Sequence, residues 1–138
     1  MPAKDIYHET VKKALITDGW TITHDPFRLD YGTHRVYADL GAEKLLAAER
    51  ANRKIIVEVK SFRRPSEVED LKEAFGAYGL YRNILIKTEA DYELYLAVSV
   101  EAYEGVFSAP LGRLLVELED LRLLVFDPQT EEISQWIP

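Results

Sequence analysis

The segment that most constrains this fold is a short apolar run near the middle of the chain. Residues 54–60 have the sequence Lys-Ile-Ile-Val-Glu-Val-Lys, which is dense in β-branched residues and too short for a confident helix. The run therefore predicts a strand, and its apolar character is typical of a central strand in a sheet. Because side chains alternate between the two faces of a strand, Glu58 and Lys60 point in the same direction. A carboxylate thus lies beside an ammonium group at the end of this strand.

Helical and strand patterns occur along the rest of the chain. Capping residues and apolar spacing predict helices over residues 5–18, 66–87, 99–107 and 110–119. Apolar alternation and turn signals predict strands over residues 20–24, 27–29, 35–40, 92–98, 121–126 and 133–137. Residues 42–52 favour a helix by composition, although residues 51–53 are also compatible with a hairpin turn. This order of elements predicts one α/β domain over residues 1–138, with a mixed β-sheet flanked by helices.

The composition restricts both the compartment and the metal chemistry. The chain has no cysteine, which excludes disulfides, thiolate zinc sites and cysteine nucleophiles and leaves oxygen atoms as the expected metal ligands. No run approaches the roughly 18 apolar residues that a membrane helix needs. Residues 1–5 also lack the apolar stretch of a secretory signal. We therefore expect a cytoplasmic protein that does not enter a membrane.

The distribution of charge limits how the chain meets nucleic acid. Its net charge of -7 argues against a protein that coats nucleic acid through its overall field. Residues 1–64 hold 12 Lys or Arg and 9 Asp or Glu, a net of +3, whereas residues 65–138 hold 5 and 15, a net of -10. The acidic half is compatible with a solvated surface or with the docking of a basic partner. The two halves are therefore expected to face different surroundings.

Asp39 and Glu58 are the expected ligands of a hard divalent cation. Asp39 closes the predicted strand 35–40, and open α/β sheets commonly hold their sites beyond the strand ends. If the two strands pair, both carboxylates converge on Mg²⁺ (or Mn²⁺), which is typically held by one or two carboxylates plus waters and phosphate oxygens. Lys60 would flank the cation and orient an attacking water or stabilise charge during phosphodiester hydrolysis. An isolated Glu-x-Lys is more often a solvated surface pair, so this spacing alone does not establish a site.

Asp39 with Glu58-Val59-Lys60 resembles the PD-(D/E)xK nuclease motif, with Ala38 where that pattern has proline. Longer blocks resemble the XisH family, the fdxN element excision controlling factors found mainly in cyanobacteria. These blocks are Pro2-Ala3-Lys4-Asp5, residues 18–26, residues 39–43, residues 58–62, residues 94–98 and Gln135-Trp136-Ile137. The resemblance covers essentially the whole chain.

The resemblance implies a restriction endonuclease-like fold and a role in developmentally programmed DNA excision. It also implies that the protein acts together with a separate site-specific recombinase and with a small partner protein, XisI. It also implies a magnesium-dependent endonuclease site of Asp39, Glu58 and Lys60, with Glu9 of the first helix as a fourth member. One departure favours a non-catalytic alternative that binds DNA or a partner: Ala77 stands where the family tends to carry a glutamine that can belong to the active site. Double-strand action would suit a homodimer.

Several other polar and aromatic residues are candidates for DNA or metal contacts. Arg63 and Arg64 suit phosphate oxygens just beyond the site, although a solvated loop is an equal alternative. The hydroxyl of Ser61 is placed to reach a phosphate, but a plain strand-end serine is at least as compatible. The three histidines, His8, His24 and His34, lack zinc spacing, so we expect capping or surface groups. The aromatic residues Phe75, Tyr78 and Tyr81 have helical spacing that favours core positions over a base-stacking platform.

Overall fold

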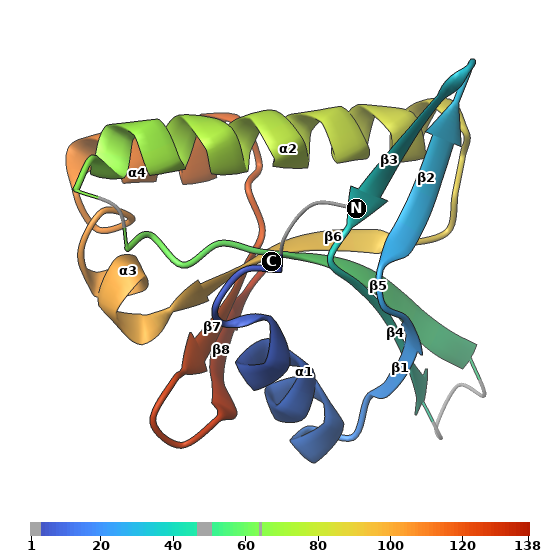
Figure 1. The fold of residues 1–138 in the computed structure, drawn as a ribbon, viewed down its shortest axis with the longest axis horizontal. Helices are drawn as coiled ribbons and strands as arrows, with labels where there is room; N and C mark the ends of the chain where they lie inside the picture. Colours follow the sequence, from blue (N-terminus) through green and yellow to red (C-terminus); the bar gives the residue numbers. More distant parts are fainter. Residues whose placement is uncertain (1–3, 47–50, 64) are drawn as a thin grey trace.

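The computed structural model describes residues 4–46, 51–63 and 65–138 of the chain. Six strands form a mixed sheet in the order β1-β4-β5-β6-β7-β8 (Figure 1). Their bounds are β1 Thr21–His24, β4 Leu40–Leu46, β5 Ala51–Val59, β6 Glu93–Ser99, β7 Leu123–Asp127 and β8 Glu132–Ile137. The β5, β6 and β7 strands run parallel, and the other neighbours pair antiparallel. The expected mixed sheet is therefore confirmed.

Helices cover both faces of this sheet, and a separate hairpin stands beside it. The helices are α1 His8–Thr17, α2 Glu67–Lys87, α3 Val100–Glu104 and α4 Pro110–Leu118, and the hairpin strands are β2 Phe27–Tyr31 and β3 His34–Ala38. In Figure 1, α2 runs along one side of the sheet and α1 lies on the other side. None of these helices, within the described ranges, has the length and apolar character needed to cross a membrane.

The β5 strand is central because its side chains are buried on both faces of the sheet. Ile55 and Val57 pack with Val11 and Leu15 of α1 in one core cluster. Ile56 packs in the other cluster, with the apolar side chains of α2. Glu58 has the same parity as Ile56, so strand alternation directs its side chain toward the α2 face. The candidate carboxylate therefore lies under α2 and away from α1.

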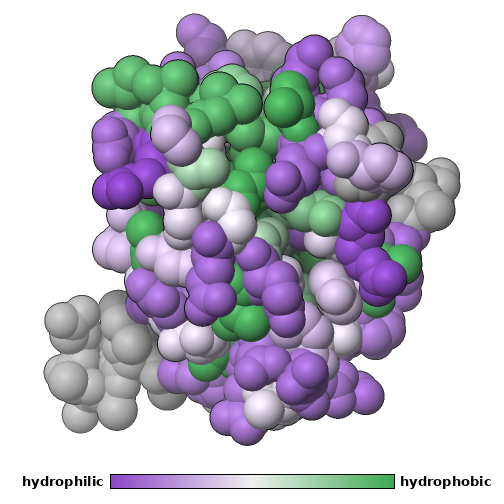
Figure 2. Space-filling view, turned by 90° about the vertical axis from the view of Figure 1, so that its left-hand side faces the viewer, coloured by the Kyte–Doolittle hydropathy of each residue, from purple (hydrophilic) through white to green (hydrophobic). Residues whose placement is uncertain are grey.

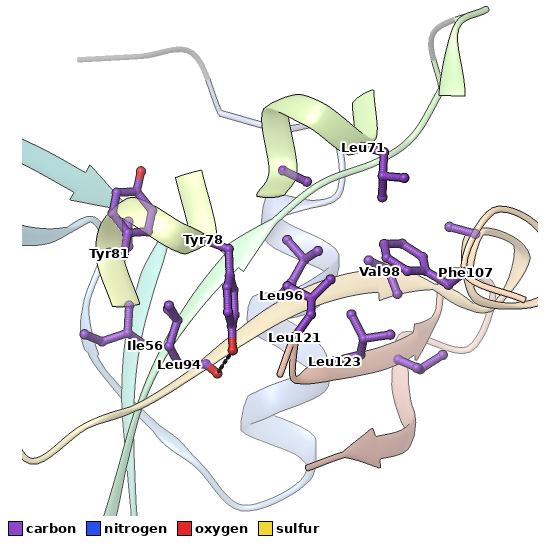
Figure 3. Packing of buried hydrophobic residues seen from close by; sticks show 14 of the residues in the cluster. Ile56, Leu71, Tyr78, Tyr81, Leu94, Leu96, Val98, Phe107, Leu121 and Leu123 are labelled. Carbon is purple, nitrogen blue, oxygen red and sulfur yellow. Dashed lines mark hydrogen bonds between the residues drawn. The ribbon is translucent and has the colours of Figure 1, made fainter. Parts of the chain in front are cut away.

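The α2 helix follows the sequence pattern closely. The Ser66 side chain caps its first turn by accepting a hydrogen bond from the backbone N–H of Glu69 at 3.2 Å. Figure 3 shows Tyr78 entering the core beside Leu96, with its hydroxyl donating to the Leu94 carbonyl at 3.2 Å. Tyr78 and Tyr81 are both buried, which confirms their predicted core positions. The long helix predicted over residues 66–87 is likewise confirmed.

The segment around Asp39 differs from the single strand predicted over residues 35–40. The β3 strand ends at Ala38 in the separate hairpin, and β4 begins at Leu40 in the main sheet. Asp39 therefore lies at the junction of two strands, where the chain passes from hairpin to sheet. The helical alternative for residues 42–52 is wrong for residues 42–46 and 51–52, because β4 pairs antiparallel with β5. Residues 47–50 lie outside the described part.

The first helix starts later than predicted, at His8 instead of Asp5. The Asp5 carboxylate accepts a hydrogen bond from the Tyr7 N–H at 2.9 Å, two residues along the chain. Its other oxygen accepts from the Ser61 N–H at 3.0 Å. Asp5 thus connects the segment before α1 with the residues that follow β5.

The α4 helix presents one apolar face to solvent. Leu111, Leu114 and Leu118 are exposed to 46%, 48% and 74%. Figure 2 shows the side of the molecule that carries α3 and α4, where an apolar patch lies beside mainly polar side chains. On the buried side, Gly112 lies against the backbone of Val106 and Phe107. The small residue at 112 thereby sets how closely α4 approaches the loop after α3.

Candidate functional site

A pocket of about 280 Å³ lies where β5 ends beneath α2. Four acidic residues and one lysine line it together: Asp5, Asp39, Glu58, Glu73 and Lys60. Tyr37, Val59, Ala74 and Tyr81 complete the lining. A larger pocket of about 430 Å³ beside Arg82 and Tyr92 contains none of the predicted site residues. The smaller pocket is therefore the one that gathers the predicted chemistry.

Asp39 and Glu58 converge at this pocket because β4 and β5 pair beside them. Leu40 is opposite Val57 in the antiparallel register, which brings the two adjacent acids together. The backbone N–H of Asp39 donates to Oε1 of Glu58 at 3.3 Å. The Asp39 Oδ2 atom accepts from the Val59 N–H at 2.7 Å. These bonds fix one oxygen of Asp39 and bring the second carboxylate close to it.

The electrostatics of the pocket favour a cation. Burial, together with the nearby charge of Asp39, raises the pKa of Glu58 to about 9. Two carboxylates in one buried site disfavour double ionisation unless a positive charge joins them. A divalent ion supplies that charge, and Mg²⁺ prefers oxygen ligands of this kind. The donor set present here therefore fits the expected metal.

His8 is a buried residue beside Asp39 that the sequence did not single out. Its exposure is only 2%, so the expectation of a capping or surface histidine is wrong for this residue. Its Nε2 atom lies 2.7 Å from Oδ1 of Asp25, and its Nδ1 atom lies 3.7 Å from Oδ1 of Asp39. Within the described residues, Nδ1 is buried without a hydrogen-bond partner. The spacing of His8 with Val11 and Leu15 on one helical stripe was the available signal for its burial.

Asp25 lies on the far side of the His8 ring and is held as a carboxylate. The Lys12 Nζ atom donates to its Oδ2 at 2.8 Å. Burial raises the pKa of Asp25, but hydrogen bonds from Lys12 and His8 outweigh that effect, and the net shift is downward. His8, Glu9 and Asp25 also offer ligand atoms within 4.8 Å of one another. Glu9 thus joins this cluster and does not line the pocket of Asp39 and Glu58.

Lys60 shares the pocket, but acidic residues of α2 hold its amine. The Nζ atom lies 2.8 Å from Oε2 of Glu73 and 3.6 Å from Oδ1 of Asp70. The Lys60 side chain is 22% exposed, so the group remains reachable from the pocket. Glu73 is a second acid, after Asp5, that sequence reasoning missed in this site. Neither lies on a predicted strand or in the motif of Asp39 with Glu58-Val59-Lys60.

Two of the predicted DNA contacts, Ser61 and Arg63, follow the pocket residue Lys60 along the chain. The half-buried Ser61 donates its backbone N–H to Asp5, and Arg63 is exposed. Arg64 lies outside the described residues. Ala77 is half-buried and does not line the pocket, whereas Tyr81, one helical turn later, does.

Comparisons with known proteins identify the family of this chain. The family model described as XisH protein matches residues 1–134. A crystal structure of an XisH family protein from Nostoc punctiforme PCC 73102 has 34% identity and a TM-score of 0.86, covering 97% of this chain and 100% of that chain. A fdxN element excision controlling factor protein from Anabaena variabilis has 37% identity and a TM-score of 0.87, covering 98% and 100%. No curated protein matches. The chain therefore belongs to the XisH family.

Proposed function

We propose that this chain is a divalent-metal-dependent DNA endonuclease that acts in the excision of a DNA element. The observation that carries the proposal is the meeting of Asp39, Glu58 and Lys60 in one pocket. The similarity to a fdxN element excision controlling factor protein supports the biological setting. The mixed sheet, with Asp39 directly before β4 and Glu58-x-Lys60 at the end of the adjacent strand β5, supports a restriction endonuclease-like core of the PD-(D/E)xK type.

Each residue of the pocket has a distinct part in the proposed reaction. Asp39 and Glu58 hold Mg²⁺ or Mn²⁺, which neutralises phosphate charge and acidifies a water when bound. Lys60 donates a hydrogen bond to the attacking water or to a phosphate oxygen, and Glu73 holds its amine in place. Ser61 and Arg63 contact phosphates on the side where the chain leaves β5, and Arg64, the next residue in the sequence, is proposed as a further phosphate contact.

The test is cleavage of supercoiled and linear double-stranded DNA with Mg²⁺ or Mn²⁺. Wild type is expected to cut, and Lys60→Ala to cut about 100-fold more slowly, the order of loss for one charge-stabilising donor. Lys54→Ala is the matched control, because Lys54 lies on β5, the strand that leads to Lys60, but its amine is over the Tyr92 ring at 5.8 Å, outside the pocket. Equal cutting by wild type and Lys60→Ala, or no cutting by either, would contradict catalysis by this chain.

A non-catalytic role is the second candidate, and the Lys60 contacts favour it. The ion pairs with Glu73 and Asp70 occupy the amine that hydrolysis needs. In this alternative the chain binds DNA or a partner protein and controls a separate recombinase. An XisI-like protein, the recombinase and a second copy of this chain are the partners to test. Partner binding without metal that survives Asp39→Ala would support this role over cleavage.

A further inference from the structure

The α4 helix exposes its apolar side chains and buries almost none of them. Leu111, Leu114 and Leu118 are 46%, 48% and 74% exposed, and Gly112 is the one buried residue of this helix, which the structure describes in full. A surface helix normally turns its apolar stripe toward the core. Figure 2 shows the apolar patch on the side of the molecule that carries α4. A patch of this kind on a mainly polar surface indicates a contact with another protein.

The three leucines form one stripe with a different neighbour on each flank. They are three and four residues apart, which is the spacing at which two helices interlock their side chains. On one flank, Arg113 and Glu117 line a pocket of about 180 Å³ together with Tyr103 of α3. On the other flank, the Glu119 carboxylate lies 3.9 Å from the Arg82 guanidinium of α2. The charged flank with Arg113 and Glu117 therefore faces away from α2.

The two charges on that flank have no partner within the described residues. Arg113 and Glu117 are both exposed, and neither side chain forms a hydrogen bond or an ion pair there. A basic partner would attract Glu117 but repel Arg113, and an acidic partner would do the reverse. A surface that satisfies both must present a base and an acid with the same spacing in the opposite order. An antiparallel copy of α4 presents such a surface.

We propose that α4 is the contact surface of a homodimer, in which it packs antiparallel against α4 of a second copy. In an isologous contact, the two-fold axis relates the same patch on both copies. When this axis passes at the level of Leu115, residues equally distant from that level lie opposite each other. Arg113 then faces Glu117 of the second copy, and Glu117 faces Arg113. Two symmetric ion pairs flank the leucines.

The same register interlocks the leucines of the two helices. Leu118 of one copy comes level with position 112 of the other copy, between its Leu111 and Leu114. Each copy thus places its leucines in the gaps of the other, as in a coiled coil. The nine residues of α4 span only about 13 Å, so the contact is small and we expect a dissociation constant on the order of tens of micromolar. No residue of α4 lines the pocket of Asp39 and Glu58, so dimerisation does not depend on whether the chain cuts DNA.

Analytical ultracentrifugation of the full chain over a series of concentrations measures this dissociation constant. We expect Leu114→Glu, at the centre of the stripe, to weaken the dimer by about 30-fold or more. Leu80→Glu is the matched control, because Leu80 is 49% exposed on α2 but lines a pocket with Tyr31 of the hairpin. It should dimerise as wild type does. Circular dichroism checks that each variant is folded.

A charge exchange tests the antiparallel register itself. Arg113→Glu leaves two acids on the flank and Glu117→Arg leaves two bases, so each variant alone should dimerise about tenfold more weakly than wild type. An equimolar mixture of the two variants places each acid opposite a base. Native mass spectrometry, which separates the three dimers by mass, should therefore show mainly the mixed dimer.

Three results would overturn the inference. A wild type that stays monomeric up to several hundred micromolar, about tenfold above the dissociation constant expected for so small a contact, would leave the leucine stripe to a different protein. Equal weakening by Leu114→Glu and Leu80→Glu would remove α4 as the specific contact. A mixture of Arg113→Glu and Glu117→Arg that forms no more mixed dimer than statistics predict would exclude the antiparallel pairing.

Discussion

Glu58 links the stability of this protein to pH through a single buried carboxyl group. Burial, followed by the charge of Asp39, raises its pKa from 4.5 to about 9 in the folded chain. In the unfolded chain the group returns to an ordinary carboxyl pKa. Between these values the folded state holds one proton more than the unfolded state. The stability from this group is therefore full below about 4.5 and is lost as pH rises through about 9.

We expect the metal-free protein to become less stable between pH 5 and pH 9, by up to about 1.4 kcal/mol per pH unit from this group. Glu58→Gln removes the titration, so its stability should depend less on pH and exceed that of wild type at pH 8. Urea unfolding in EDTA across this range measures both. Glu43→Gln, on β4 outside the pocket, is the control and should keep the wild-type slope. Identical slopes in wild type and Glu58→Gln would show that Glu58 ionises freely.

At the scale of elements, glycines in two helices have opposite surroundings. A Cβ atom on Gly76 of α2 would meet nothing within 4 Å. A Cβ on Gly112 of α4 would overlap the Val106 carbonyl and lie 2.7 Å from the Cα of Phe107. Only the second glycine is required by packing, since backbone atoms cannot move aside as a flexible side chain can.

We therefore expect Gly76→Ala to stabilise the protein by about 0.5–1 kcal/mol, because alanine favours the helix and loses less backbone entropy. Gly112→Ala should destabilise it by about 1–3 kcal/mol through overpacking of α4 against the loop after α3. Urea unfolding at one pH measures the two changes together, and each variant is the control for the other. Destabilisation of the same size in both would show that α2 also needs glycine for packing.

The elements also show what a sequence can and cannot reveal here. The strand at residues 54–60 and the helix at residues 66–87 were predictable, because apolar spacing and the Ser66 cap act within a few residues. The transfer of the chain from hairpin to sheet at Asp39 was not, because the apolar pattern continues across it. Asp5 was also missed in the site, since its contact with Ser61 spans 56 residues. Such contacts depend on tertiary packing that local patterns do not encode.

Across the whole molecule, the two charge halves occupy opposite halves of the sheet. The strands β1, β4 and β5 come from the half with net charge +3, and β6, β7 and β8 from the half with net charge -10. The α1 helix packs against β1 and β8 and so joins the two edges. The pocket lies near the boundary, at the end of β5. Because four acids line it, phosphate approaches favourably only with a bound cation and basic side chains nearby.

Arg63 is an exposed basic residue that follows the pocket along the chain. Its effect on DNA affinity therefore tests whether basic side chains near the pocket bind phosphate. Each phosphate contact contributes about 0.9 to the slope of log affinity against log salt concentration. We expect Arg63→Ala to reduce that slope by about one contact, similarly for every duplex sequence.

Fluorescence anisotropy with labelled duplex DNA and Ca²⁺ in place of Mn²⁺ measures the slope while limiting cleavage. Arg113→Ala, exposed on α4 in the acidic half, should leave the slope unchanged. An equal reduction in both variants would mean that DNA spans the acidic half, and no reduction in Arg63→Ala would remove this arginine from the DNA surface.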